Sequence, residues 1–531
     1  MSQVIPVFKP WVPGWLVKVT IFLVILPCLL LFGLSTANSG AAAGFYGIEP
    51  ADVQYSMIIF YAAVASFFAL ERRFFVYIAS REYFIVGVGL QILTSYICFH
   101  THSLPVLFIF RFIQGMANCM TTSICITLIF SRLQGERARE IGYSVFYGML
   151  LCITPISILL TAPVVDNYDY NFLYKGMMFC YIPGAILLLC MMNAVRLNKK
   201  IPLYQIDWPS FVIYAAVLCL IGYVLAYGQQ YYWLQDSRIW KSCIAIVVLL
   251  IIHVYRQLNL KRPSQNMTVF KYRNYVVGMC LIFVLYIVRG ALGVTNLYFS
   301  NVLGMDPYHI SYIMLANIIG IIVSILISSR LLILKRPVRL IWIYGFVLLL
   351  IYHAWMVFLF NTQADAPTFI IPLILQGMGA GMLMTPIIVF AISSVPERLG
   401  GTASAVGVFF RFLGFCSSIA LVNFYQLYNK TNHVNRFQEQ LTNLNPVAVD
   451  RLATYKRMLM SKGVPADQAT KIATGLLSRS VDVQAQIRSA VDYYTLISIL
   501  LVVVVLVIAL IPYINRTIIN VRSKQPAPIS Y

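Results

Sequence analysis

The sequence predicts an all-α membrane protein whose chain crosses the bilayer fourteen times. Hydrophobic residues make up 60% of its 531 residues and charged residues only 11%, whereas about a quarter of a soluble domain is charged. The hydrophobic residues form long blocks, and nearly every block reaches the roughly 20 residues that a membrane-spanning helix needs. Membrane barrels show short alternating segments instead. These observations exclude a soluble domain and indicate a bundle of transmembrane helices.

The predicted spans follow one another along the whole chain. Their approximate limits are 16–36, 53–70, 83–101, 104–131, 141–163, 174–194, 208–229, 240–258, 274–297, 308–330, 338–360, 366–391, 401–427 and 491–514. The first block lacks a small-residue cleavage site and is followed by many more blocks. It is therefore predicted to be a first span and not a removable signal.

Basic residues mark one side of these spans as cytoplasmic. With the N-terminus inside, the inner segments hold Lys9, Lys18, Arg72, Arg73, Arg81, Arg132, Arg137, Arg139, Arg196, Lys199, Lys200, Arg256, Lys261, Arg262, Lys271, Arg273, Arg330, Lys335, Arg336, Arg339, Arg398, Arg516, Arg522 and Lys524. The short outer loops hold only Arg238, Lys241 and the boundary residue Lys175. Because Lys and Arg concentrate in cytoplasmic loops, we expect both termini to be cytoplasmic.

The spans fall into two predicted six-helix bundles, residues 1–200 and 270–531, joined by two linker spans within 205–260. Weak internal repeats of this kind are usual in secondary transporters. Residues 428–490 form a polar stretch between the last two spans, with helix-like pieces at 433–442, 446–461 and 465–490. Long loops cross a membrane regardless of their charge. We predict a small helical lobe on the outer face here, with a disordered loop as the alternative.

Several functional classes lack their sequence signatures. The net charge is +21, but the basic residues lie at helix ends and not in a patch, which argues against a nucleic-acid partner. The eleven cysteines lie in apolar blocks without Cys-x-x-Cys pairs or a histidine cluster, so we predict no metal site and no cofactor. No P-loop, Ser-His-Asp arrangement or paired catalytic carboxylates are evident. An ATP-driven pump and an enzyme are therefore disfavoured.

Three arginines lie inside predicted spans, whereas none of the eighteen acidic residues lies in the middle of one. A charge inside a membrane costs free energy, so we expect each of these arginines to have a structural or functional role. Arg111 shares one helix face with Gln114, Asn118 and Thr122, because offsets of 3, 7 and 11 residues return to the same side. This face either lines a cavity or forms a proton-linked switch. The alternative is structural: Arg111 joins two helices by hydrogen bonds to backbone carbonyls.

Arg411 lies on a face of small residues in the thirteenth span. Ser404, Gly407, Gly414 and Ser418 share this face at spacings of 3 and 4. Small residues allow helices to approach closely. Arg411 either contributes to tight helix packing or contacts the substrate, and the sequence does not choose between these two roles.

Arg289 in the ninth span shares a face with Tyr286, Gly293 and Asn296. It is the best candidate for recognising an anion or another polar group. The alternative is that its long side chain reaches back to the membrane interface.

Gln376 opens the sequence Gln-Gly-Met-Gly-Ala-Gly in the twelfth span. The alternate glycines predict a helix contact or hinge and not a phosphate loop, because no strand precedes them. His353 lies in the middle of the eleventh span, where it is either a packing residue or a proton carrier. The other candidates for proton coupling lie at the outer mouth: Glu49, Asp52 and Asp492.

The motifs resemble those of a known transporter family. Residues 111–115 form Arg-x-x-Gln-Gly, residues 377–381 form Gly-x-Gly-x-Gly, and residues 411–414 form Arg-x-x-Gly. In the outer lobe, the motif residues are Asn445-Pro446, Gly463, Gln484-Ala485 and Asp492. The chain thus resembles the fourteen-span drug:proton antiporters of the EmrB/QacA type, in the major facilitator superfamily (MFS), and its lobe resembles that of EmrB.

The resemblance implies an MFS fold and a proton-coupled exporter in a bacterial inner membrane. It also implies a periplasmic adaptor (a membrane fusion protein) and an outer-membrane channel as partners. The chain departs from the family pattern at three places. Residues 74–81 lack the Asp and glycines of the loop after span two, residues 153–163 lack the antiporter motif, and Phe32 lies near the place of an acidic residue. Gating and coupling residues therefore do not carry over.

Our preferred hypothesis is a secondary active exporter of amphipathic small molecules that works by alternating access. Three intramembrane arginines without mid-span acids predict a cavity that disfavours cations and accepts neutral or anionic lipophilic molecules. The alternative is a degenerate MFS protein that serves as a membrane scaffold or binds a partner without active transport. The altered loop and span-five motifs are the reason for keeping this alternative.

Overall fold

The computed structural model describes residues 7–132, 138–195, 206–442 and 444–510. The predicted domain limits at 200 and 205 and both chain ends lie outside these residues. Several basic residues used to orient the chain also lie outside them: Arg137, Arg196, Lys199, Lys200, Arg516, Arg522 and Lys524.

Within the described residues, fourteen helical segments are long and apolar enough to cross a membrane. The helices that form them are α1 (Gly14–Ala37), α3 (Pro50–Tyr77), α4 (Ser80–His100), α5 (Leu104–Arg132), α6 (Ala138–Asn167), α7 (Phe172–Met191), α8 (Trp208–Tyr227), α9 (Ser237–Asn259), α10 (Arg273–Arg289), α12 (Pro307–Ile333), α13 (Val338–Leu359), α14 (Ile370–Ser393), α15 (Gly400–Asn423) and α18 (Ala466–Leu510). The shorter helices are α2 (Ser39–Tyr46), α11 (Ala291–Asn301), α16 (Lys430–Glu439) and α17 (Pro446–Ser461). The predicted all-α membrane fold is confirmed.

Local sequence explains where several helices begin and turn. At the start of α3, Glu49 and Asp52 form a capping box and Pro50 occupies the first turn, where its missing N–H costs nothing. Asn445 caps α17 by accepting a hydrogen bond from the backbone N–H of Val447. After α17, Gly463 adopts a φ of 84°, a conformation that glycine tolerates better than other residues. The turn sequences therefore agree with the helices they separate.

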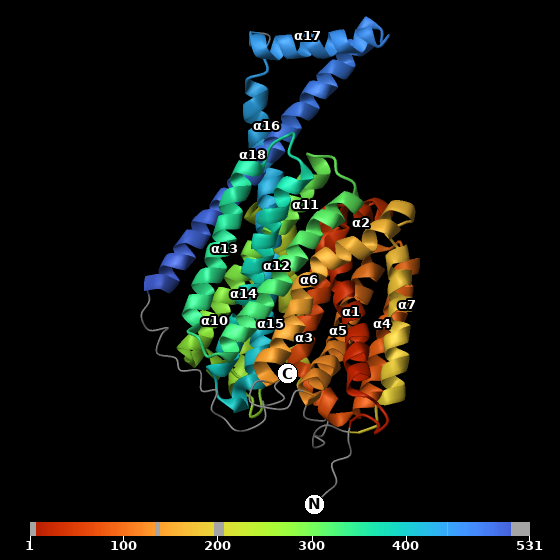
Figure 1. Ribbon diagram of the computed structural model, residues 1–531, viewed down its shortest axis with the longest axis vertical. Coiled ribbons are helices and arrows are strands. Elements are labelled where there is room, and N and C mark those ends of the chain that lie inside the picture. The colour runs from red at the N-terminus through yellow and green to blue at the C-terminus, as the bar shows by residue number, and fades with distance from the viewer. Residues whose placement is uncertain (1–6, 133–137, 196–205, 443, 511–531) are drawn as a thin grey trace, which may run out of the picture.

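Figure 1 shows the first half of the chain, coloured red to yellow, beside the second half, coloured green to blue. Helices α1, α3, α4, α5 and α7 pack mainly within the first half, and α10, α12 to α15 and α18 pack mainly within the second, whereas α6 packs more against the second half than against the first. The halves meet where α6 packs against α12 and α14, and where α3 packs against α15. This arrangement leaves the inner faces of α1, α3, α10 and α15 available to enclose a cavity.

The linker pair attaches to this bundle through α8. Helix α8 packs against both α3 and α15, whereas α9 packs mainly against α8. Arg256 at the end of α9 donates to Asp207, which caps α8, at 2.9 Å. Burial opposes ionisation of Asp207, but hydrogen bonds from Ser210 and Arg256 outweigh it and lower the pKa of this carboxyl. The ion pair thus holds the two linker helices together at one end.

The alternate glycines of α14 lie in tight helix contacts, as their spacing predicts. A Cβ at Gly377 would lie 2.2 Å from the backbone oxygen of Asn317 in α12, and one at Gly379 would lie 2.6 Å from Leu349 in α13. A Cβ at Gly320 of α12 would lie 2.2 Å from the backbone oxygen of Ile374. Only residues without a Cβ permit helices to come this close.

Three predicted spans contain a break or a change of helix type in the structure. The predicted span 274–297 is broken at Gly290 into α10 and α11, and the predicted span 366–391 starts with a 3-10 turn over Ala366–Phe369. The predicted span 401–427 ends α15 at Asn423 and continues as a π-helix over Phe424–Asn429. The hydrophobic periodicity of the sequence does not reveal a helix break, a 3-10 turn or a π-helix, because the spacing of the hydrophobic residues stays close to that of an α-helix in each.

The lobe consists of α16, α17 and the first part of α18, and it projects beyond the bundle in Figure 1. The predicted helix 465–490 and the last span, predicted at 491–514 and described to residue 510, are one continuous helix of 45 residues, which is about 67 Å long at 1.5 Å per residue. This segment contains no proline, so nothing in it forces the helix to stop at the membrane surface. We refer to the side of the bundle that carries α16 and α17 as the lobe end.

Candidate transport cavity

A cavity with a volume of about 680 Å³ lies between the two halves. Its lining comes from α1, α2, α3, α5 and α6 of the first half and from α10, α11, α12, α14 and α15 of the second. On α3 it extends from Gln54, near the lobe end, to Phe68. A space of this size and apolar character is typical of small-molecule sites. Its position between two helical bundles is the place where secondary transporters bind cargo.

Arg289 and Arg411 are the charged residues among the described residues that line this cavity. Arg411 donates from Nε to the backbone oxygen of Gly407 at 3.3 Å and from Nη1 to the hydroxyl of Tyr147 at 3.4 Å. The guanidinium carbon of Arg289 lies 5.5 Å from the centre of the Tyr286 ring. Within the described part of the chain, neither arginine forms an ion pair with a carboxylate. The cavity wall therefore carries positive charge without a fixed counterion.

Arg289 owes its position to the break between α10 and α11. It is the last residue of α10, where a basic side chain interacts favourably with the helix dipole. The following residue, Gly290, lies so close to α15 that a Cβ would be 2.8 Å from Ser418. Helix α11 then carries Asn296 to the cavity, where its Oδ1 is buried without a described hydrogen-bond partner. The predicted pair of Arg289 and Asn296 is thus brought to one wall.

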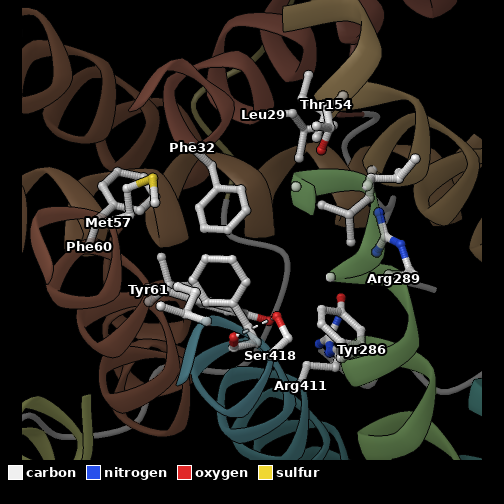
Figure 2. A pocket seen from close by; sticks show the side chains of 18 of the residues that line it. Leu29, Phe32, Met57, Phe60, Tyr61, Thr154, Tyr286, Arg289, Arg411 and Ser418 are labelled. Carbon is white, nitrogen blue, oxygen red and sulfur yellow. Dashed lines mark hydrogen bonds between the residues drawn. The ribbon is translucent and has the colours of Figure 1, made fainter. Parts of the chain in front are cut away.

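An aromatic wall lies across the cavity from Arg289 (Figure 2). The ring of Phe32 lies 5.3 Å from that of Tyr61, 6.0 Å from that of Phe60 and 5.7 Å from that of Phe415, measured between centroids. Figure 2 shows Phe32, Phe60 and Tyr61 across the cavity from Arg289. Such rings present large apolar surfaces and can contact flat or cationic groups. The cavity therefore has an aromatic surface on α1 and α3 opposite Arg289 (Figure 2).

The predicted polar face of α5 is divided by the structure. Arg111 is fully buried and donates to Gln114 at 2.8 Å, and Gln114 donates to Ser95 of α4 at 3.0 Å. The guanidinium of Arg111 also lies 4.7 Å from the ring centre of Phe60 in α3. Neither Arg111 nor Gln114 is among the residues that line the cavity. These contacts join α3, α4 and α5 directly behind the cavity-lining ring of Phe60.

Asn118 lies on the same helix as Arg111 but reaches the cavity. Its Nδ2 donates to the backbone oxygen of Cys28 in α1 at 2.5 Å, and its Oδ1 accepts from Thr122 at 3.1 Å. One turn of α5 therefore separates a buried structural cluster from a cavity-lining position.

Gln376 and His353 lie away from the cavity lining. Gln376 is buried between α12 and α14, where it accepts a hydrogen bond from Asn317. His353 is fully buried, and its Nδ1 lies 2.7 Å from the backbone oxygen of Leu349. Its ring packs 5.2 Å from that of Tyr494 in α18. Both side chains join helices within the second half.

The predicted acidic coupling residues lie at the lobe end and outside the cavity lining. Asp52 accepts a hydrogen bond from the Tyr227 hydroxyl of α8 at 2.5 Å, and Glu49 accepts one from Gln230. Asp492 on α18 accepts from Asn429 at 3.0 Å and lies 2.8 Å from Nε2 of His433. Each acid therefore holds an element of the lobe end to a neighbour.

Sequence reasoning missed the burial of Glu71 and most of the aromatic wall. Glu71 follows the predicted second span, but α3 continues to Tyr77 and the side chain is fully buried, with a hydrogen bond from Tyr83 at 2.9 Å. The sequence carries no signal for this burial, because the predicted span ends at residue 70. For the aromatic wall, the sequence marks Phe32 only as a replacement for an acid, because a single aromatic residue in an apolar span does not reveal which helix it faces.

Comparison with known families identifies the chain. The family model described as Major Facilitator Superfamily matches residues 19–418. The chain belongs to the Major Facilitator Superfamily.

Three relatives show similarity over most of the MFS chain. The colistin resistance protein EmrB of Acinetobacter baumannii is 22% identical over 432 residues, which cover 80% of this chain and 82% of that protein. The multidrug export protein EmrB of Haemophilus influenzae is 22% identical, over 69% and 71% of the two chains. The probable multidrug resistance protein EmrY of Escherichia coli is 21% identical, over 82% and 84%. The predicted resemblance to EmrB-type transporters is confirmed.

Solved structures share the MFS fold at low sequence identity. A peptide transporter of the POT type has a TM-score of 0.60 at 13% identity and covers 96% of this chain and 97% of its own. The human organic anion transporter MFSD10 has a TM-score of 0.50 at 12% identity, covering 78% and 95%. These structures support the fold, while the family match and the named relatives identify the chain as a multi-pass membrane transporter and not an enzyme.

Proposed function

We propose that this MFS protein exports amphipathic small molecules across a bacterial inner membrane by alternating access. In this scheme, the cavity between the halves opens to the cytoplasm, takes up its cargo and then opens at the lobe end. The observation that carries the proposal is a single cavity with an aromatic wall and two arginines, Arg289 and Arg411, enclosed by both halves. The names of the relatives, which include multidrug export proteins, support export as the direction.

The charge of the cavity disfavours cationic cargo. Two guanidinium groups in an apolar site lose part of their hydration, so a bound anion stabilises them and a bound cation is repelled. The rings of Phe32, Phe60 and Tyr61 supply apolar contact area for the body of the cargo. Neutral and anionic lipophilic molecules are therefore the preferred class, and lipophilic cations of the ethidium kind are poor substrates.

The test compares a lipophilic anion with a cation of similar size in proteoliposomes. In Arg289→Gln and Arg411→Gln, the anion should bind about tenfold more weakly, since a charge-assisted hydrogen bond contributes about 1.5–3 kcal/mol, while neutral cargo changes little. Arg238→Gln is the matched control, because Arg238 is exposed in the first turn of α9, outside the cavity lining. Strong, selective export of an ethidium-like cation by the wild-type protein would contradict the proposal.

Proton coupling is proposed from the family resemblance. The candidates remain His353, Glu49, Asp52 and Asp492, none of which lines the cavity. A proton taken up at any of them would act on cargo through helix movement and not by direct contact. An imposed proton gradient that leaves export unchanged would argue against coupling.

We also propose that both termini are cytoplasmic and that the lobe is periplasmic. In this orientation the lobe meets a periplasmic adaptor of the membrane-fusion type, which links the transporter to an outer-membrane channel. The order of motif residues in the lobe and the similarity to EmrB-type relatives support this assembly. Protease accessibility of the lobe from the outer side tests the orientation.

The second candidate function is a scaffold that binds its partner without transport. The absent loop and span-five motifs favour it. An adaptor that co-purifies with the protein, together with no flux of any anionic, neutral or cationic probe in proteoliposomes, would support the scaffold over the exporter.

A further inference from the structure

Tyr61 of α3 joins the aromatic wall of the cavity to its arginines. Its ring belongs to the wall, since it lies 5.3 Å from the ring of Phe32 and 5.6 Å from that of Phe415, measured between centroids. Its hydroxyl interacts electrostatically with Arg411 and with the hydroxyl of Tyr286. One side chain of the first half therefore spans the space from the wall to the basic groups of the second half.

The guanidinium of Arg411 is held in one orientation by contacts from both halves. Its Nε donates to the backbone oxygen of Gly407 at 3.3 Å, and its Nη1 donates to the hydroxyl of Tyr147 in α6 at 3.4 Å. The ring of Tyr147 also lies 5.5 Å from the guanidinium carbon. Because the N–H donors of a guanidinium form a rigid planar fork, a fixed arginine binds an oxyanion in a defined place.

The second arginine adjoins the same place through Tyr286. The ring centre of Tyr286 lies 5.5 Å from the guanidinium carbon of Arg289, and its hydroxyl also interacts with Arg411. Figure 2 shows Tyr286 beside both arginines. An ionised carboxylate accepts several hydrogen bonds at its two oxygens. The hydroxyl end of Tyr61 is thus the place in the cavity that suits an acidic group.

The length of Tyr61 limits how far this acidic group lies from the aromatic wall. In Tyr61 itself, a hydroxyl attached directly to the ring reaches Arg411 while the ring stays in the wall. A cargo ring that packs along Tyr61 brings an acidic group to Arg411 when a short link joins the two. A longer chain must fold back or pull the ring away from the wall, and ordering its extra rotatable bonds costs entropy.

We propose that Tyr61 sets the distance between the ring and the acidic group of the cargo, so that the cavity selects aromatic acids whose acidic group is joined to the ring directly or through one carbon. This inference rests on the proposed export of lipophilic anions and narrows that class. The Tyr61 ring contacts the ring of the cargo, and its hydroxyl donates to the acidic group.

The first test measures binding to the purified protein in detergent. A ligand can reach the cavity at the lobe end, because the lining there includes the exposed residues Ser300, Asn301 and Pro307. The probes are naphthoate, naphthylacetate and naphthylbutanoate, and protein-free micelles give the background. Naphthoate and naphthylacetate should bind about tenfold more tightly than naphthylbutanoate, although the last has the largest apolar surface and would bind best by hydrophobicity alone.

The second test separates the two parts of Tyr61. Tyr61→Phe keeps the ring and should weaken naphthoate binding about tenfold, as for a lost hydrogen bond to a charged group, while binding of the neutral naphthamide stays near that of the parent. Tyr61→Leu should weaken the binding of both probes. The matched control is Tyr55→Phe, because the Tyr55 hydroxyl on the same helix donates to the backbone oxygen of Cys219 at 3.4 Å, outside the cavity lining.

Equal affinities for the three acids, or no binding of any of them, would overturn the inference. So would a Tyr61→Phe variant that binds naphthoate as the parent does. Because these assays need no transport, their outcome is separate from that of the proposed export. A protein that shows this preference but moves none of the acids in proteoliposomes would refute export and leave the binding inference in place, whereas export of all three acids at equal affinity would refute the inference alone.

Discussion

At the scale of single residues, the position of each charge decides its role. Arg111, Arg289 and Arg411 look alike in the sequence, since each interrupts an apolar block. The structure places Arg289 and Arg411 on the cavity wall and buries Arg111 against Phe60 and Gln114. Which way a side chain on a buried helix faces depends on the neighbouring helices. A single sequence therefore reveals the charge but not its surroundings.

The acids of the lobe end allow a prediction at this scale. Asp52→Ala removes the hydrogen bond from Tyr227 and half of the capping box of α3. We expect a loss of about 1 kcal/mol in stability, as is usual for a helix cap, and a lower unfolding temperature in detergent. If Asp52 is an anchor for α8, the pH dependence of transport stays unchanged.

Asp365→Ala is the control for Asp52→Ala, because Asp365 is exposed in the loop between α13 and α14. Asp365→Ala should change neither the unfolding temperature nor the pH dependence of transport. Transport by Asp52→Ala that no longer responds to pH would instead identify Asp52 as a coupling residue.

At the scale of elements, alternate small residues set how closely helices approach. The Gly-x-Gly-x-Gly segment of α14 was interpreted from sequence as a helix contact or hinge, and its glycines lie against α12 and α13. The sequence could predict a close helix contact because regularly spaced glycines on a transmembrane helix allow a neighbouring helix to approach. The partner helices were not predictable, since any of the other spans could have supplied the facing surface.

Gly377→Ala tests this contact. The new Cβ would lie 2.2 Å from the backbone oxygen of Asn317, so α12 and α14 must separate. Overpacking of this kind costs about 1–3 kcal/mol, which a thermal-unfolding assay in detergent detects. Gly89→Ala is the matched control, because no atom lies within 4 Å of its added Cβ. Equal unfolding temperatures for the two variants would contradict the close packing of α12 and α14.

At the scale of the whole molecule, the lobe stands apart from the transport bundle. Helix α17 makes its main contacts with α18, and Figure 1 shows it lying across the far end of the molecule. Arg451 and Arg457 are exposed on α17. The lobe can thus serve a partner without taking part in the enclosure of the cavity.

The double variant Arg451→Glu with Arg457→Glu tests this separation. If α17 contacts the adaptor, reversing two charges should reduce adaptor co-purification about tenfold, as expected for a loss of roughly 1.4 kcal/mol. Transport in proteoliposomes should remain at the wild-type level. Arg238→Glu with Lys241→Glu reverses two charges at the start of α9 and should leave adaptor binding unchanged. A fall in transport in proteoliposomes would show that the lobe also contributes to the transport cycle.

The sequence by itself determined that this is a fourteen-span helical membrane protein with arginines at depth, because hydrophobic length, charge and glycine spacing act locally along the chain. Only the tertiary structure decided that Arg289 and Arg411 face a shared cavity, that Phe32 belongs to its aromatic wall, and that Gln54 meets Asn423. The contact between Gln54 and Asn423 joins residues 369 positions apart. Such pairings depend on how the helices pack, and that is a property of the assembled bundle rather than of any one segment.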